Sequence, residues 1–94
     1  MNKDIIVQIG NSDDKLTQKR WSLFVEETKF DIDCFAKSIY FFGGSNNFAP
    51  WQNVCIAFSI DEKDIERLKE RLIERRKTYM QDSVAWLEGE TLFI

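Results

Sequence analysis

The chain has 94 residues, of which 44% are hydrophobic and 14% aromatic, and its 13 basic and 16 acidic residues give a formal net charge of −3. This length suits one domain, residues 1–94, with one core, and the apolar content is too high for an intrinsically disordered chain. Because binding to a phosphate backbone depends on an excess of basic residues, the charge argues against a nucleic acid partner.

Hydropathy along the chain argues against a membrane partner. No apolar run approaches the roughly 18 residues that a membrane-spanning helix needs. The first ten residues, MNKDIIVQIG, contain no long apolar region of the kind found in a secretory signal. We therefore expect a cytoplasmic protein.

The missing residue types exclude several classes of enzyme. The chain has no histidine, which excludes Ser-His-Asp and Cys-His mechanisms and most mixed-ligand zinc or iron sites. Its two cysteines, Cys34 and Cys55, are too few for an all-thiolate zinc site, and in a cytosolic setting we expect buried free thiols. We expect no catalytic residue set, no cofactor and no metal, which favours a protein that is not an enzyme.

The first predicted element is a strand over residues 4–10. The stretch DIIVQIG alternates, so that Ile5, Val7 and Ile9 share the face opposite to Gln8. The turn-forming residues GNS then end the strand.

The second predicted element is a helix over residues 17–35. Thr17 suits an N-cap, because Leu16 and Trp21 flank it as a hydrophobic staple. Apolar side chains then recur at helical spacing, in a stripe of Trp21, Phe24, Val25, Thr28, Ile32 and Phe35. The segment KFDIDCF also alternates like a strand, so the end of this helix stays open by a turn or more.

A strand over residues 37–44 follows. Strict alternation places Ile39 and Phe41 on one face and Tyr40 and Phe42 on the other. It ends in two glycines, which begin a connection over residues 43–50.

The third predicted strand covers residues 51–60. It shows the clearest alternation in the chain, with an apolar face of Val54, Ile56, Phe58 and Ile60. The eight-residue connection before it exceeds the roughly two to five residues of an ordinary hairpin loop. Because Phe48 in this loop has no evident core role and Trp51 follows closely, we predict a contact site here.

A second helix begins after Asp61, with Asp64 at the position that a capping box uses. The run RRK at residues 75–77 ends it and complements the helix dipole. Its buried stripe should consist of Ile65, Leu68, Leu72 and Tyr79. The last segment, residues 83–94, has a strand-like pattern with Gly89 as a bulge or kink.

This order of strand, helix, strand, strand, helix, strand predicts an α+β fold. With right-handed crossovers it is most simply a split βαβ, ferredoxin-like sandwich. A four-stranded antiparallel sheet would carry both helices on one face. Because this architecture hosts many functions, any function has to be argued from a site.

The leading site hypothesis concerns the face of the sheet that the helices leave open. Alternation places there Ile6, Gln8, Tyr40, Phe42, Trp51, Cys55, Ala57 and either Trp86 or its neighbours Ala85 and Leu87. A face this apolar is typical of a protein interface. We predict a protein partner, foremost a second copy in a homodimer, or an acidic inhibitor or adaptor that binds another protein. The predicted contact residues are Tyr40, Phe42, Phe48, Trp51 and Trp86.

The competing hypothesis is a small-molecule-binding protein or enzyme with a pocket under the 43–53 loop. Tyr40, Trp51, Cys55 and Glu88 would line it, since aromatic walls with a few polar groups are typical of ligand pockets. An RNA-binding function is disfavoured, because the third strand reads NVCIAFSI and lacks the aromatic RNA-recognition motif.

The charged clusters are interpreted as surface features. Arg71, Arg75, Arg76 and Lys77 are expected on a solvated helix face, with neighbours such as Glu74 as ion-pair partners. The acidic pairs match no calcium loop and no catalytic spacing; they are Asp13 with Asp14, Asp31 with Asp33, and Glu88 with Glu90.

Overall fold

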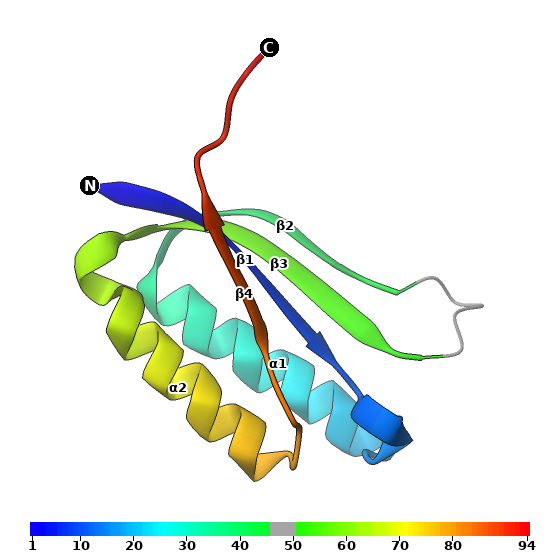
Figure 1. Cartoon of the computed structure of the whole chain (residues 1–94). Coiled ribbons are helices and arrows are strands. Elements are labelled where there is room, and N and C mark those ends of the chain that lie inside the picture. Colours follow the sequence, from blue (N-terminus) through cyan, green and yellow to red (C-terminus); the bar gives the residue numbers. More distant parts are fainter. Residues whose placement is uncertain (46–50) are drawn as a thin grey trace.

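The computed structural model describes residues 1–45 and 51–94 and shows the expected order of elements (Figure 1). The elements are β1 (Asn2–Gly10), η1 (Ser12–Asp14), α1 (Gln18–Phe35), β2 (Ala36–Gly44), β3 (Asn53–Asp61), η2 (Glu62–Asp64), α2 (Ile65–Thr78) and β4 (Ala85–Gly89), where η denotes a 3-10 turn. The strands form one antiparallel sheet in the order β2-β3-β1-β4, and both helices cover the same face. The predicted ferredoxin-like α+β sandwich is confirmed.

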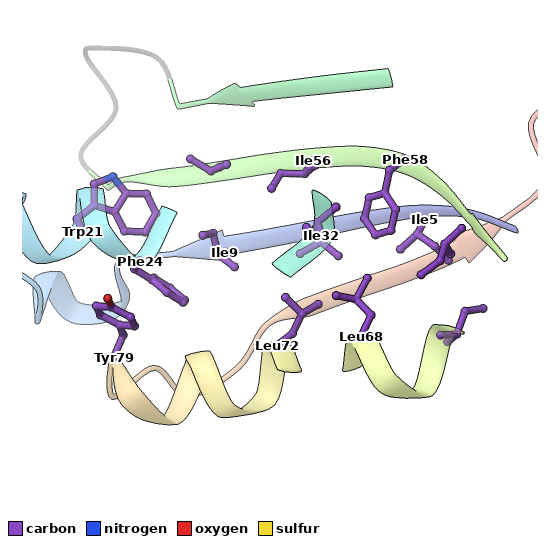
Figure 2. Close-up of a cluster of buried hydrophobic side chains, with 14 of the residues drawn as sticks. Ile5, Ile9, Trp21, Phe24, Ile32, Ile56, Phe58, Leu68, Leu72 and Tyr79 are labelled. Atoms are coloured by element: carbon purple, nitrogen blue, oxygen red, sulfur yellow. The ribbon is translucent and has the colours of Figure 1, made fainter. Parts of the chain in front are cut away.

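The core lies between the sheet and the helices (Figure 2). Ile5, Val7 and Ile9 of β1 point into it, as their alternation predicts. The apolar face of β3 and the stripe of α2 meet them there; the buried members are Val54, Ile56, Phe58, Ile60, Ile65, Leu68, Leu72 and Tyr79. The apolar residues of β1 and β3 point to the same side of the sheet, and the helices cover that side.

The start and end of α1 follow from local chemistry. The Thr17 side chain caps the helix by accepting a hydrogen bond from the backbone N–H of Arg20 at 3.2 Å. Helical conformation ends at Phe35, and Ala36 is already extended, with φ −66° and ψ 142°. The helix therefore passes directly into β2. The segment KFDIDCF is helical throughout, although its residues alternate like those of a strand.

The start of α2 differs from the prediction. Asp61 does act as a cap, because its carboxylate accepts a hydrogen bond from the backbone N–H of Lys63 at 3.0 Å. The capped turn is the 3-10 turn η2, however, and α2 begins only after it. Asp64 makes no side-chain capping bond and pairs with Arg67 at 3.9 Å instead. Backbone hydrogen bonding to Asp61 lowers the pKa of that carboxyl group.

A β-bulge in β2 overturns the predicted faces of this strand. Ile39 lies opposite Phe58 of β3, but Phe41 lies opposite Ala57, so Tyr40 is an extra residue in the strand. Because an extra residue reverses the alternation beyond it, Phe41 faces away from the helices. Phe42 turns toward them, where the Lys29 Nζ lies 5.7 Å from its ring centroid.

The pairing of β4 decides between the two faces considered for Trp86. Trp86 lies opposite Val7 and faces the helices, with its ring packed edge-on against Phe58 at a centroid separation of 6.3 Å. Leu87 lies opposite Ile6 and therefore belongs to the open face, together with Ala85. The prediction of Trp86 on the open face is wrong.

The end of β4 also differs from the predicted pattern. Gly89 is the last residue of the strand, so it is neither a bulge nor a kink within a longer one. Residues 90–94 continue outside the sheet.

The cysteine side chains are free but less buried than expected. Cys34 is exposed on α1, and Cys55 is half-buried on β3. Cys34 lies at the helix surface, with a guanidinium nitrogen of Arg71 at 4.0 Å from its Sγ. The expectation of two buried thiols is therefore wrong.

A buried carboxylate joins the two helices, which corrects the view of the arginines of α2 as solvated. Asp31 of α1 is fully buried, with 0% of its side chain exposed. Arg75 of α2 donates to both of its oxygens, from Nε at 2.8 Å and from a terminal nitrogen at 3.3 Å. The Nε of Arg71 lies 3.5 Å from the same carboxylate. Two residues of the basic cluster therefore neutralise a charge at the helix interface.

Arg75 also contacts a second acidic residue at this interface, Glu27. Its guanidinium donates to Glu27 at 3.3 Å, and Tyr79 donates its hydroxyl proton to the other oxygen of Glu27. The hydrogen bond to Asp31 raises the pKa of Arg75, while burial and the bond to Glu27 raise the pKa of Tyr79. The neutral phenol of Tyr79 thus contributes stability that is present below its ordinary pKa and is lost as the pH rises through the raised value.

We expect Arg75→Met to lower the free energy of unfolding by about 3 kcal/mol or more, because it leaves the Asp31 carboxylate buried with reduced compensation. Arg67→Met is the matched control on the same helix. Arg67 packs over Phe35 at 5.3 Å and forms only a long surface ion pair, so its loss should cost under about 1 kcal/mol. Urea denaturation of both variants tests this difference, and equal losses would contradict it.

Candidate functional site on the open face of the sheet

The face of the sheet opposite the helices carries an uncharged central region. Within the described part of the chain, its outward positions between the level of Asp4 and the level of Asn53 are Ile6, Gln8, Tyr40, Phe41, Gly43, Cys55, Ala57, Ala85 and Leu87. None of these is Asp, Glu, Lys or Arg. The large apolar or aromatic members Ile6, Tyr40, Phe41 and Leu87 are all exposed. We call these nine residues the open-face patch.

The bulge in β2 places two consecutive aromatic side chains on this patch. Tyr40 and Phe41 both face outward, because Tyr40 is the additional residue and Phe41 lies opposite Ala57. The Phe41 ring lies close over Gly43, where an added Cβ would be only 2.6 Å from the ring Cζ. Gly43 thus leaves room for the ring beside the strand, which widens the apolar surface at the β2 edge.

Asp4 forms a hydrogen-bonded junction at one end of the patch. The Tyr40 hydroxyl donates to its Oδ1 at 3.1 Å. Thr91, beyond the end of β4, donates to its Oδ2 from Oγ1 at 2.7 Å and from the backbone N–H at 3.1 Å. The Thr91 hydroxyl first, and the Tyr40 hydroxyl next, lower the pKa of Asp4.

Two hollows flank this junction. One, of about 250 Å³, is lined by residues that include Ile6, Tyr40, Ala57 and Leu87. The other, of about 470 Å³, is lined by Asp4, Tyr40, Thr91 and Phe93. Because Asp4, Tyr40 and Thr91 line both, the hollows adjoin. Both hollows therefore lie beside Tyr40.

Of the four predicted contact residues that the structure describes, only Tyr40 lies on the patch. Phe42 and Trp86 face the helices, because of the bulge in β2 and the pairing of β4. Phe48 lies outside the described residues. Trp51 is exposed but precedes the first residue of β3, so it is not part of the sheet.

The four residues of the predicted ligand pocket are not brought together. Tyr40 reaches Asp4, whereas Trp51 lies beyond the sheet end where Asn53 pairs with Gly10. Gly10 lies six positions after Asp4 in β1, which corresponds to about 20 Å at the rise of a strand. Glu88 points to the helix side, where it accepts a hydrogen bond from Trp86 Nε1 and pairs with Lys69 at 3.7 Å. Cys55 shares the open face with Tyr40 but lies opposite Gln8.

Sequence reasoning missed Phe41, Asp4 and Thr91 as members of this surface. For Phe41 the chain offers no signal, because strict alternation predicts the wrong face beyond a bulge. Asp4 could have been found, since it alternates in phase with Ile6 and therefore shares the outward face. Thr91 joins the site only through the path of the chain after β4.

Two further properties of the described residues bear on function. No group of three or more His, Cys, Asp or Glu side chains in ranges 1–45 and 51–94 is placed to hold a metal ion. Among the helices that the structure describes, none combines the length and the apolar character needed to cross a membrane.

Comparisons with known proteins identify the fold and no family. No family model matches the chain, and no curated protein matches it in sequence. A solved structure of a protein from Arabidopsis thaliana has a TM-score of 0.63 and 7% identity, covering 100% of this chain and 98% of that one. A hydroxynitrile lyase from Passiflora edulis has a TM-score of 0.53 and 12% identity, covering 97% and 95%.

A third solved structure, from Bacteroides fragilis, is described as a dimeric protein of unknown function with a ferredoxin-like fold. It has a TM-score of 0.52 and 13% identity, covering 96% of this chain and 95% of that one. These likenesses establish a ferredoxin-like α+β domain. At such identities they extend to the fold alone, and the same fold carries an enzyme in one neighbour.

We expect Thr91→Val to raise the pKa of Asp4 toward its ordinary value of 3.8, because the Thr91 hydroxyl is the main stabiliser of the ionised carboxylate. The stabilisation from these bonds is present above pH 3.8 and is lost as the pH falls through the lower pKa of the folded protein. NMR titration of the Asp4 carboxyl carbon measures the shift. Thr78→Val is the control, since the Thr78 hydroxyl donates to Glu74 within α2 and should leave Asp4 unaffected. An identical Asp4 pKa in both variants would refute the junction.

Proposed function

We propose that this protein is a non-enzymatic interaction module that forms a symmetric homodimer through the open-face patch, and we expect it in the cytoplasm. The observation that carries the proposal is an uncharged surface with four exposed large side chains, Ile6, Tyr40, Phe41 and Leu87. Contiguous apolar surface of this kind is typical of a protein interface.

The distribution of charge favours this face over the helix layer. Surface ion pairs occur along the helices, including Lys29 with Asp33 at 2.9 Å and Lys69 with Glu66 at 3.8 Å. The central region of the open face holds no charged side chain, and interface cores are depleted in charge and enriched in aromatic residues. Two protomers with a net charge of −3 each can therefore approach through this face without placing like charges opposite one another.

The architecture is compatible with this assembly. The neighbour from Bacteroides fragilis is described as dimeric, which shows that a ferredoxin-like domain of this size can dimerise. A two-fold axis would place the same patch on both sides of the interface, as in most soluble homo-oligomers.

A ligand-binding function is the second candidate, and the observation in its favour is the pair of hollows beside Tyr40. The larger, of about 470 Å³, lies within the range of about 300–1,000 Å³ for small-molecule sites, and the smaller, of about 250 Å³, lies just below it. Of the predicted pocket residues, Tyr40 lines both hollows, whereas Glu88 lines the smaller one only and its carboxylate is bonded to Trp86 Nε1. A thermal-shift screen against metabolites tests this candidate, which a stabiliser that is lost in Tyr40→Ala would support.

We expect the protein to be a dimer at roughly tens of micromolar, and Phe41→Glu to weaken the dimer at least about tenfold, because the change buries a charge in the interface. Phe30→Glu is the matched control. Phe30 on α1 is 58% exposed and Phe41 is 55% exposed, but they lie on opposite layers of the sandwich. Sedimentation equilibrium measures both dissociation constants. A monomeric parent protein, or equal effects of the two changes, would overturn the proposal.

Thiol labelling provides a second test with an internal control. Cys55 belongs to the open-face patch, whereas Cys34 is exposed on α1. We expect Cys55 to react slowly with a thiol reagent at concentrations where the dimer forms, and faster on dilution, because dissociation uncovers it. The rate for Cys34 should not depend on protein concentration. A Cys55 rate that is equally independent of concentration would contradict dimerisation through this face.

A further inference from the structure

The segment that follows β4 exposes three consecutive apolar side chains. Leu92 and Phe93 are 80% and 96% exposed, and Ile94 is fully exposed. Figure 1 shows this segment running past the end of β4 and away from both helices. Residues 92–94 therefore bury almost nothing against their own protomer, although they are among the most apolar in the sequence.

The base of this segment, in contrast, is held firmly. Thr91 donates two hydrogen bonds to Asp4, and Tyr40 donates a third to the same carboxylate. Asp4 shares the outward face of β1 with Ile6, so the attachment lies on the open side of the sheet. The chain is thus fixed at Thr91 on the open side of the sheet, and Phe93 lines a hollow there together with Asp4 and Tyr40.

The dimensions of the sheet indicate why this segment matters for assembly. Four strands about 4.8 Å apart and up to nine residues long give a face of about 20 by 30 Å, or about 600 Å². Stable interfaces usually bury about 800 Å² per partner. An aromatic side chain such as Phe93 buries about 150–250 Å² when it is covered. The sheet face alone therefore lies at the lower end of the usual range of about 600–1,000 Å² per partner, and residues 92–94 bring it closer to the middle of that range.

We propose that residues 92–94 of each protomer pack across the open-face patch of the other. The hydrogen bonds between Thr91 and Asp4 hold the base of the segment in place for this contact. This inference rests on the proposed dimer and names the segment that completes it. The hollow lined by Ile6, Tyr40, Ala57 and Leu87 receives an apolar side chain of the partner's segment. Under two-fold symmetry both exchanges occur at once, so the contact is made twice in each dimer.

The first test compares two double variants of the full chain by sedimentation equilibrium. Leu92→Ser with Phe93→Ser removes two apolar side chains of the segment. Leu23→Ser with Phe30→Ser removes the same pair of residue types from exposed positions on α1. We expect the first variant to raise the dimer dissociation constant at least about tenfold and the second to leave it within about threefold of the parent value.

The second test detects the contact directly. In a background of Cys34→Ser and Cys55→Ser, one sample of protein carries Phe93→Cys and the other carries Leu87→Cys. Mixing the two under oxidising conditions should give a disulfide-linked heterodimer in higher yield than mixing Phe93→Cys with Phe30→Cys, because only Leu87 belongs to the open-face patch.

The outcomes separate this inference from the proposed function. A dimeric parent that is weakened by the segment variant and forms the Phe93–Leu87 cross-link supports both. A dimeric parent with an unchanged dissociation constant in the segment variant overturns the exchange of residues 92–94 and leaves the sheet-face dimer standing. A monomeric parent overturns the proposed function, and this inference with it.

Discussion

The buried carboxylate of Asp31 is the constraint on which the arrangement of the two layers depends. A charge with 0% exposure is stable only where cations meet it in good geometry, and Arg75 and Arg71 of α2 provide them. This requirement fixes α2 relative to α1, while Leu68 and Leu72 fill the space between the helices and the sheet. With both helices committed to one face, the opposite face of the sheet is left without cover (Figure 1).

One extra residue in β2 decides which aromatic side chains this strand presents on the open face. The bulge at Tyr40 moves Phe41 outward and Phe42 inward, and so puts two adjacent aromatic side chains on the same surface. At the other edge of the sheet, the pairing of β4 with β1 moves Leu87 outward and keeps Trp86 in contact with Phe58. The outward aromatic surface is therefore concentrated at the β2 edge, and Trp86 stays packed against the core.

Charge and hydrogen bonding divide the molecule into two surfaces with different properties. The helix layer carries ion pairs that are screened by salt and contribute little individually, apart from the partly buried network around Asp31. At one end of the open-face patch lies the Asp4 carboxylate, whose oxygens are occupied by Tyr40 and Thr91. A face that is apolar in its centre, with its nearest carboxylate already satisfied, is suited to burial against another protein.

Local sequence patterns predicted the elements well, since the signals that they use are local. Thr17 marks the start of α1, the alternation of Val54, Ile56 and Phe58 marks β3, and the order of elements implies the ferredoxin-like arrangement. The candidate site was predicted only in part. Its location on the open face and Tyr40 followed from alternation, but Phe42 and Trp86 were placed on the wrong side.

The sequence by itself therefore determined the class of fold, the core stripes and the existence of an uncovered apolar face. Only the tertiary structure decided which side chains that face presents and which charged residues of α1 and α2 pair with one another. The bulge brings Phe41 opposite Ala57, 16 residues away in the chain, and the register of β4 brings Leu87 opposite Ile6, 81 residues away. The ion pair between Asp31 and Arg75 joins residues 44 apart. Periodicity reports the local environment of a residue, whereas these features depend on the neighbour that the folded chain brings to it.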